Sequence, residues 1–243
     1  RHHAGRFWVF FGTPDDGFFM SQAASPAGPW SAPYPILKEA GWDDCTVLWD
    51  DDGQAYFLGT HFSDGYKSYI WKMSPDGRSI DRASAVLINE GAGREASKLL
   101  KIDGWYYIIY SEALGGSRYV LAKRSRAPMG PYAETRQLTE PNREANEPNQ
   151  GGIVQAHDGN WYFLTHHGRQ DWEGRAMSLL PVTWTDGWPV IGAVGPNGRG
   201  LMSWGGAKPV KSRPAPRQRT DTFSARALAP DWEWMHNPRP GFW

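Results

Sequence analysis

Two acidic residues of this chain each stand directly before an apolar segment that has the composition of a β-strand. Asp44 and Glu95 hold this position, and Gln150 and Arg175 hold the corresponding position before two later segments. Two carboxyl groups and an arginine that converge on one pocket suit cleavage of a glycosidic bond. One carboxylic acid protonates the leaving oxygen, and a second carboxylate activates water or attacks carbon. The arginine can hold sugar hydroxyls and influence the acids through its charge.

Both carboxylates have competing interpretations. Asp44 could cap a turn or a strand, and its neighbour Asp43 could hold the role predicted for it. Glu95 follows Arg94, with which it could form a surface ion pair. Glu112 is a rival acid, but it follows its strand where Glu95 precedes one. Asp44 and Glu95 are therefore the predicted catalytic pair.

Further polar and aromatic residues surround these segments. Trp42 is predicted to line the pocket, with plain packing as the alternative. His166 and His167 are adjacent on a strand and point to opposite faces, so at most one should face the pocket; His167 is the predicted sugar contact. Cys45 is interpreted as a small buried apolar residue. The run 50–52 before Gly53 is interpreted as the solvated tip of a hairpin, because Asp-Gly closes such turns.

The composition limits the classes of partner. The 243 residues contain 26 basic and 26 acidic side chains, so no net field attracts nucleic acid or a membrane surface. The single cysteine excludes an internal disulfide framework and a cysteine metal cluster. No apolar run reaches the ~18 residues of a membrane span. Aromatic residues make up 14% of the chain, which indicates rings packed between sheets first and rings stacked on sugars second. Compartment and oligomeric state stay open.

A repeat of about fifty residues organises the chain. An aromatic strand follows Gly5, Gly53, Gly104 and Gly159, and these glycines lie 48, 51 and 55 residues apart. Short strands with glycine and proline turns at such a period are typical of a β-propeller, in which the innermost strands run side by side around an axis. This arrangement would bring residues at equivalent positions of successive repeats into one funnel.

The last part of the chain departs from the repeat. A hairpin over 177–192 is interpreted as a fifth unit, which predicts an all-β, five-bladed propeller over 1–211 with the innermost strand of its first blade missing. Residues 212–220 are basic and proline-bearing, as in a linker. Residues 221–243 are predicted to begin an incomplete C-terminal β-sandwich. The chain is expected to be cut at both ends.

Several motifs together resemble glycoside hydrolase family 43. The resemblance rests on residues 42–44 and 50–53, on Glu95 ahead of 98–100 and 104–107, on 149–152, and on the long motif 172–189. It implies a five-bladed propeller that acts as a β-xylosidase, α-L-arabinofuranosidase, exo-xylanase or arabinanase with inversion of configuration. The oligosaccharide substrate is the implied partner.

The resemblance also implies roles. Glu95 would be the general acid, Asp44 the carboxylate that orients and tunes it, and Arg175 a contact to the sugar. Gln150 is a substrate-binding candidate and stands near where many members place a histidine beside a central cation. No cofactor is required and no metal ligand is predicted, although the resemblance leaves room for a structural Ca²⁺ near the axis. The general base is expected to be an aspartate on a strand before Arg1, and thus absent from this chain.

Three functions follow as hypotheses. The first is an exo-acting glycosidase whose base lies outside the chain. The second is a carbohydrate-binding propeller with little or no catalysis. The third, a propeller that binds other proteins, is disfavoured by the balanced charge and the converging carboxylates.

Overall fold

The computed structural model describes residues 1–141, 149–168, 175–206, 220–226, 228 and 232. The chain divides into two compact units, Arg1–Trp204 and Gly205–Trp243. In the second unit no strand is assigned among the described residues, where Asp221 accepts a hydrogen bond from the Trp232 indole at 2.7 Å. The predicted linker and most of the predicted sandwich segment lie outside the described residues.

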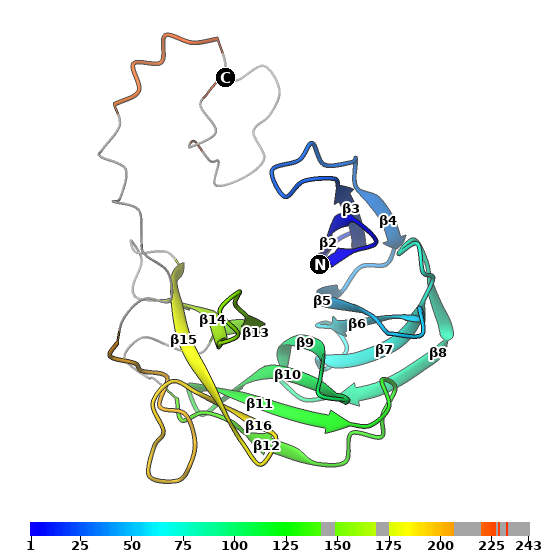
Figure 1. Ribbon diagram of the computed structural model, residues 1–243. Helices are drawn as coiled ribbons and strands as arrows, with labels where there is room; N and C mark the ends of the chain where they lie inside the picture. Colours follow the sequence, from blue (N-terminus) through cyan, green and yellow to red (C-terminus); the bar gives the residue numbers. More distant parts are fainter. Residues whose placement is uncertain (142–148, 169–174, 207–219, 227, 229–231, 233–243) are drawn as a thin grey trace. The chain divides into compact units, whose positions relative to one another are not determined.

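The first unit consists of four antiparallel four-stranded sheets in a propeller arrangement (Figure 1). The strands of each sheet follow one another along the chain. The first sheet contains β1 (His2–His3), β2 (Arg6–Thr13), β3 (Gly17–Ala23) and β4 (Tyr34–Leu37). The second contains β5 (Trp42–Trp49), β6 (Ala55–His61), β7 (Lys67–Met73) and β8 (Ile80–Asn89). The third contains β9 (Glu95–Ile102), β10 (Trp105–Leu114), β11 (Ser117–Ser125) and β12 (Thr135–Gln137). The fourth contains β13 (Asn149–Gln155), β14 (Trp161–Gly168), β15 (Arg175–Thr185) and β16 (Trp188–Ile191).

Two-residue turns close several of these hairpins. Asp103 and Gly104, with φ of 50° and 71°, join β9 to β10, and Asp186 and Gly187, with φ of 52° and 73°, join β15 to β16. Positive φ at both central residues is the requirement of a type I′ turn, whose twist matches that of the flanking strands. The Asp-Gly pairs therefore fix these registers locally.

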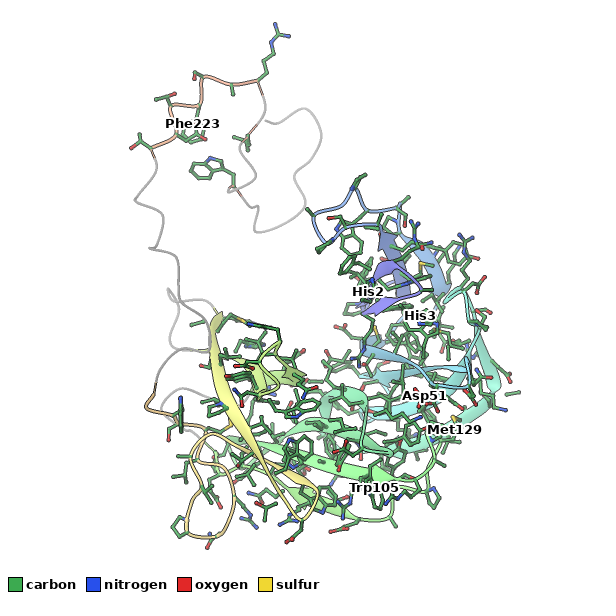
Figure 2. The ribbon with its side chains drawn as sticks, in the orientation of Figure 1. His2, His3, Asp51, Trp105, Met129 and Phe223 are labelled. Carbon is green, nitrogen blue, oxygen red and sulfur yellow. The ribbon has the colours of Figure 1, made fainter. Side chains whose placement is uncertain are left out.

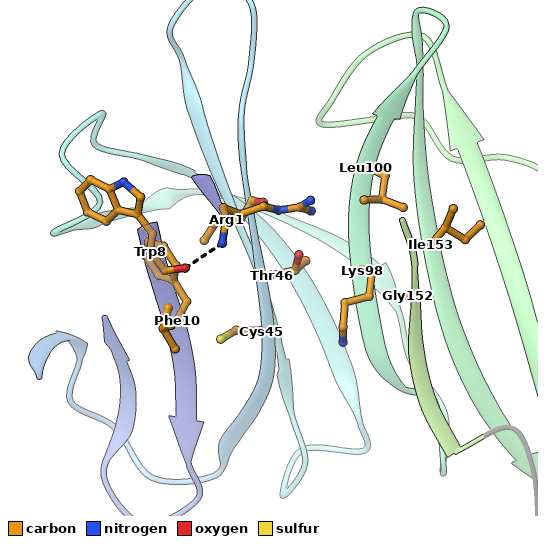
Figure 3. A pocket seen from close by; sticks show the side chains of 11 residues that line it. Arg1, Trp8, Phe10, Cys45, Thr46, Lys98, Leu100, Gly152 and Ile153 are labelled. Atoms are coloured by element: carbon orange, nitrogen blue, oxygen red, sulfur yellow. Dashed lines mark hydrogen bonds between the residues drawn. The ribbon is translucent and has the colours of Figure 1, made fainter. Parts of the chain in front are cut away.

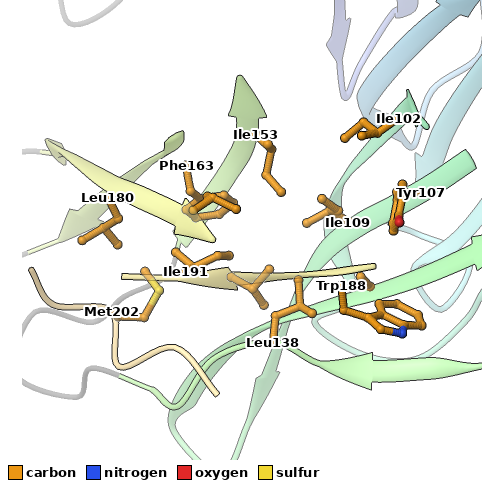
Figure 4. Close-up of a cluster of buried hydrophobic side chains, with 13 residues drawn as sticks. Ile102, Tyr107, Ile109, Leu138, Ile153, Phe163, Leu180, Trp188, Ile191 and Met202 are labelled. Carbon is orange, nitrogen blue, oxygen red and sulfur yellow. The ribbon is translucent and has the colours of Figure 1, made fainter. Parts of the chain in front are cut away.

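Apolar clusters fill the spaces between successive sheets. The cluster between the third and fourth sheets is drawn in Figure 4 and includes Ile109, Phe163 and Ile191, each at most 1% exposed. Four tryptophans are at most 7% exposed: Trp8, Trp42, Trp71 and Trp188. Burying a large apolar side chain contributes roughly 1.5–3 kcal/mol, so these rings are major contributors to the packing of the sheets. Figure 2 draws the described side chains on the four sheets. Packing between sheets, the first of the two interpretations of the aromatic content, is confirmed for these four rings.

The interpretation of residues 177–192 as a separate fifth blade is wrong. The hairpin is β15 and β16, and β15 pairs with β14 along its length, from Trp161 opposite Val182 to Gly168 opposite Arg175. It therefore completes the fourth sheet. The aromatic-strand repeat marks only one strand of each sheet, so it counts sheets correctly but does not show which strands close each one.

Other expectations on the fold can be compared directly with the strands. In the first sheet, whose innermost strand was expected to be missing, the two-residue β1 occupies that place and pairs with β2. The strand over 54–58 was predicted to be buried on both faces, and residues 55–60 of β6 are all buried. Among the described residues, the structure contains no helix that is long and apolar enough to cross a membrane.

Candidate active site

The innermost strands of the second, third and fourth sheets share an irregularity near their first residues. Each strand carries a register shift, and the residue at the shift has a left-handed backbone: Asp44 at φ 45°, Ala96 at 63° and Gln150 at 57°. Non-glycine residues rarely adopt this conformation, and bulges of this kind re-aim side chains beside active sites. The structurally equivalent residues are thus Asp44, Ala96 and Gln150. The predicted equivalence is off by one residue at Glu95, and it is wrong for Arg175, because Arg175 begins β15, which is not an innermost strand.

Asp44 is the point at which the three sheets meet. Its Oδ2 accepts a hydrogen bond from the backbone N–H of Ala96 at 2.9 Å, and its Oδ1 accepts one from the side-chain amide of Gln150 at 2.8 Å. Because Ala96 directly follows Glu95, the first of these bonds sets Asp44 beside the predicted acid. The structure brings Asp44, Glu95 and Gln150 together, as the repeat predicted.

Asp43 is a third carboxylate at this site. Its Oδ1 accepts the backbone N–H of Asp44 at 2.8 Å, which stabilises the left-handed backbone there. Burial raises the pKa of Asp43, and the charges of Asp44 and Glu95 add to this effect. Space for it exists because residue 12 is glycine: a Cβ at Gly12 would lie 2.9 Å from Asp43 Oδ1. The sequence analysis named Asp43 only as a rival of Asp44, whereas the structure gives it a supporting contact.

Glu95 is paired with an arginine that the sequence analysis did not identify. Arg118, at the start of β11, donates to Glu95 Oε1 at 2.5 Å, and the Glu95 side chain is 15% exposed. The alternative pairing of Glu95 with Arg94 is wrong, because Arg94 binds Glu112 at 3.1 Å. Glu112 is 5% exposed. Arg118 lies on β11 opposite Ala113 of β10, and Glu95 lies on β9 on the other side of β10, so no local pattern signals their pairing.

A cavity of about 330 Å³ lies among the inner strands, lined from all four sheets by residues that include Phe10, Cys45, Lys98 and Gly152 (Figure 3). Lys98 of β9 donates from Nζ to the carbonyl oxygen of Ala96 at 3.0 Å. Burial lowers the pKa of Lys98, and the charge of Asp44 acts against that change. The sequence analysis did not single out Lys98, although its place three residues after Glu95 on an inner strand was a signal that could have found it.

Cys45 lines the same cavity and is only half-buried, packed against the apolar cluster of the first two sheets, so its interpretation as a buried apolar residue holds in part. Burial raises the pKa of its thiol to about 12. The run 50–52 is not simply a solvated tip. Lys101 and Tyr106 of the third sheet donate to the Asp50 carboxylate, whose side chain is 7% exposed. Burial alone would raise the pKa of Asp50, but these hydrogen bonds bring it below its usual range.

The remaining predicted contacts divide into three cases. Trp42 is 4% exposed and packs against Phe18 and Trp71, so its prediction as a pocket wall is wrong: the ring belongs to the core between the first two sheets. Arg175 is exposed at the start of β15, and no hydrogen bond or ion pair connects it to the carboxylates in the described part of the chain. His167 lies on β14, but its side chain is outside the described residues.

The resemblance leaves room for a cation site, for which the described residues offer few candidate ligands. No group of three or more histidine, cysteine, aspartate or glutamate side chains comes together there in a way that could hold a metal ion. The Gln150 amide donates to Asp44. The structural Ca²⁺ near the axis stays a prediction, because this ion also takes backbone carbonyl, side-chain amide and water oxygens.

Comparison with known proteins places these features in a family. The model of glycosyl hydrolases family 43 matches residues 1–189. A Xylanibacter ruminicola protein that is provisionally named a beta-xylosidase is 37% identical to this chain over 247 residues. The match covers 100% of this chain and 46% of the relative. A beta-xylosidase of Formosa agariphila is 31% identical over 276 residues, with the same two coverages. The chain thus spans about half the length of the curated relatives that it matches.

A Bacteroides ovatus protein named non-reducing end alpha-L-arabinofuranosidase BoGH43B is 29% identical over 275 residues, covering 100% of this chain and 48% of its own length. The solved structure titled Bacteroides ovatus Xyloglucan PUL GH43B matches with a TM-score of 0.74 and 27% identity, and the match covers 100% of this chain and 50% of that one. The family model, which accounts for all four sheets up to the start of β16, and the propeller that surrounds Asp44 and Glu95 agree: this chain belongs to glycosyl hydrolases family 43.

Proposed function

We propose that the protein is a glycoside hydrolase that removes terminal xylose or arabinose from xylan- or arabinan-derived oligosaccharides with inversion of configuration. The observation that carries the proposal is the way in which Asp44 is bound beside Glu95. Its two carboxylate oxygens accept hydrogen bonds from Ala96 and Gln150, which belong to two other sheets. A carboxylate fixed by rigid strands in this way is preorganised for chemistry. The names of the relatives, beta-xylosidase and alpha-L-arabinofuranosidase, favour a pentose as the sugar removed.

In this mechanism Glu95 is the general acid that protonates the leaving glycosidic oxygen. Asp44 orients the sugar ring and the acid, and Arg175 and His167 are proposed sugar contacts near the open end of β14 and β15. Arg118 sets the direction of the Glu95 carboxyl group. Proton donation requires the glutamate to release this arginine or to share its second oxygen with the substrate.

Inversion needs a separate base that activates water on the opposite face of the sugar, with the two carboxyl groups roughly 6.5–9.5 Å apart to leave room for that water. Asp43 and Asp44 do not suit this role, because Asp43 is bound to the Asp44 backbone and Asp44 is bound by Ala96 and Gln150. We therefore assign the base to an aspartate outside this chain, as the resemblance implies.

The proposal includes a five-bladed propeller. The fourth sheet exposes one apolar face, on which Val154, Leu164, Met177 and Leu179 are 43–63% exposed. The first sheet likewise exposes Val9 at 43%. Two further apolar side chains of this sheet, Phe11 and Phe19, stack on each other with their ring centroids 5.7 Å apart. A fifth sheet between these two faces would cover both, whereas the missing base would lie on the innermost strand of the first sheet, before Arg1.

The test uses the protein extended upstream of Arg1. Its hydrolysis of nitrophenyl xyloside and nitrophenyl arabinofuranoside is measured first, and its hydrolysis of xylobiose and arabinobiose second. We expect turnover with inversion, seen as the anomer first formed by proton NMR. Glu95→Gln should lower the rate on xylobiose by about 10²–10⁴-fold, and less on nitrophenyl xyloside, because a good leaving group needs little protonation.

Glu140→Gln is the matched control, since Glu140 pairs with Arg199 outside the site and should leave both rates unchanged. An equal loss on good and poor leaving groups would remove Glu95 from the acid role. No turnover by the extended protein would end the proposed activity.

A carbohydrate-binding propeller is the second candidate, favoured by the engagement of Glu95 with Arg118 instead of a free carboxyl group. Calorimetric titration of the extended protein with xylobiose and arabinobiose separates the two functions. Binding without hydrolysis supports the binding module, and hydrolysis excludes it.

A further inference from the structure

Lys98 is a cationic residue at the centre of this propeller that the mechanism above does not use. Its side chain leaves β9 among the residues that line the axial cavity (Figure 3). An ammonium group in such a place is costly unless it is hydrogen-bonded and paired with an opposite charge. The structure supplies the hydrogen bond, which runs from Nζ to the carbonyl of Ala96. The charge of Asp44 also favours the ammonium form, against the effect of burial on the pKa of Lys98.

The contacts of Lys98 and Asp44 meet on the same residue. Ala96 accepts from Lys98 through its carbonyl oxygen at 3.0 Å and donates to Asp44 through its N–H at 2.9 Å. Ala96 also holds the left-handed backbone of the bulge, with φ at 63°. Lys98 thus binds the carbonyl group of Ala96, and the N–H group of the same residue binds the Asp44 carboxylate.

We propose that Lys98 is a positioning residue that acts through Ala96 and through its charge to hold the Asp44 carboxylate in the geometry used with Glu95. Its effect on the sugar is indirect. The part that concerns catalysis rests on the proposed function, whereas the coupling between Lys98 and Asp44 is a property of the folded chain and is measurable without activity.

The titratable and charged groups that act on Lys98 are Asp44 and Cys45 of β5 and the guanidinium of Arg1. Asp43, although it is bonded to Asp44, is not among them. This difference between two adjacent aspartates supplies a matched pair of variants for the test.

The first experiment follows the Lys98 side chain by NMR, using lysine labelled with ¹³C at Cε and Lys98→Met for assignment. We expect Asp44→Asn to move the titration midpoint of Lys98 down by about one pH unit, because a nearby opposite charge favours the ammonium form. Asp43→Asn should leave that midpoint in place. Equal shifts from both substitutions, or no shift from Asp44→Asn, would overturn the proposal.

The second experiment compares Lys98→Met with Lys98→Arg in the extended, active protein. We expect Lys98→Met to lower kcat by about 10–100-fold with little change in KM, as for a group that orients a catalytic carboxylate without touching the substrate. Its unfolding midpoint should be no lower than that of the wild type, because a buried charge is removed and a side chain of similar length remains. Lys98→Arg should recover part of kcat.

Loss of stability in parallel with kcat, or an unchanged kcat, would contradict the positioning role. If the extended protein has no activity at all, the proposed function fails, but the NMR result still decides whether Lys98 and Asp44 are coupled.

Discussion

At the scale of single residues, the site is decided by how each carboxylate is held. Asp43 and Asp44 are neighbours in the sequence, yet their contacts differ. Asp44 binds two other sheets, and Asp43 binds the backbone of Asp44. The left-handed φ of Asp44 is the physical cause, because it turns the two side chains away from the alternation of a regular strand.

The raised pKa of Asp43 has a consequence for stability. A carboxyl group whose folded pKa lies above its unfolded value contributes stability below the unfolded pKa and loses it as pH rises through the folded pKa. Asp43→Asn keeps an oxygen that can accept the Asp44 N–H but carries no charge. We therefore expect this variant to be more stable than the wild type at pH 7, with the advantage shrinking as pH falls toward 4.

Urea unfolding of both proteins between pH 4 and pH 8 measures this difference. Asp15→Asn, in an exposed turn of the first sheet, is the control and should show no such trend. An advantage that grows toward low pH would contradict the account of Asp43.

At the scale of elements, close packing between neighbouring sheets sets the positions of the strands that carry the bulges. Gly59 of β6 lies opposite Cys45, next to the bulge of β5, and a Cβ there would come within 2.5 Å of the Phe18 ring of the first sheet. Phe18 is fully buried, so its ring has no free space into which it could move. The absence of a side chain at this position allows the first and second sheets to approach each other.

Gly59→Ala should therefore destabilise the chain by about 1–3 kcal/mol, the usual cost of overpacking a core. Gly152→Ala is the matched control: it also lies on a strand, but its added Cβ would meet only the Lys98 side chain, at 3.7 Å, an ordinary contact. Chemical unfolding of the two variants compares them directly. A Gly59→Ala protein as stable as Gly152→Ala would show that the two sheets can separate at little cost.

At the scale of the whole molecule, the exposed apolar face of the fourth sheet is the main feature. On β14, Phe163 points into the core while Leu164 is 43% exposed, and on β15 Leu180 and Leu179 show the same alternation. Both faces of this sheet are thus apolar, which is typical of a blade that lies between two others.

The double substitution Leu164→Ser and Leu179→Ser tests this feature. In the 243-residue chain it should change stability little, because both side chains are well exposed. In a longer protein that includes the proposed fifth sheet it should cost about 2–4 kcal/mol, since that sheet would bury both leucines at roughly 1–2 kcal/mol each. Calorimetric unfolding of the four proteins gives the comparison, and equal effects in both lengths would argue against a covering sheet.

Much of the fold follows from local signals. The aromatic strands after Gly53, Gly104 and Gly159 and the Asp-Gly turns were readable because alternation and turn conformation depend on neighbours in sequence. The nearness of Asp44, Glu95 and Gln150 followed from the same repeat, although the structural equivalent of Asp44 in the third sheet is Ala96.

What only the tertiary structure decided are contacts between residues far apart in the chain. These include the pairing of Glu95 with Arg118 instead of Arg94, the burial of Trp42 and Asp50, and the membership of β15 and β16 in the fourth sheet. The hydrogen bond from Ala96 to Asp44, which joins the third sheet to the second, is of the same kind. Sequence by itself determined the turns and the aromatic strands of the four repeats, but it set the starts of the innermost strands too late, since Asp44, Glu95 and Gln150 all lie inside them. The partners of each charge and ring depend on how sheets stack, and stacking is set by the fit of whole surfaces, which no local pattern records.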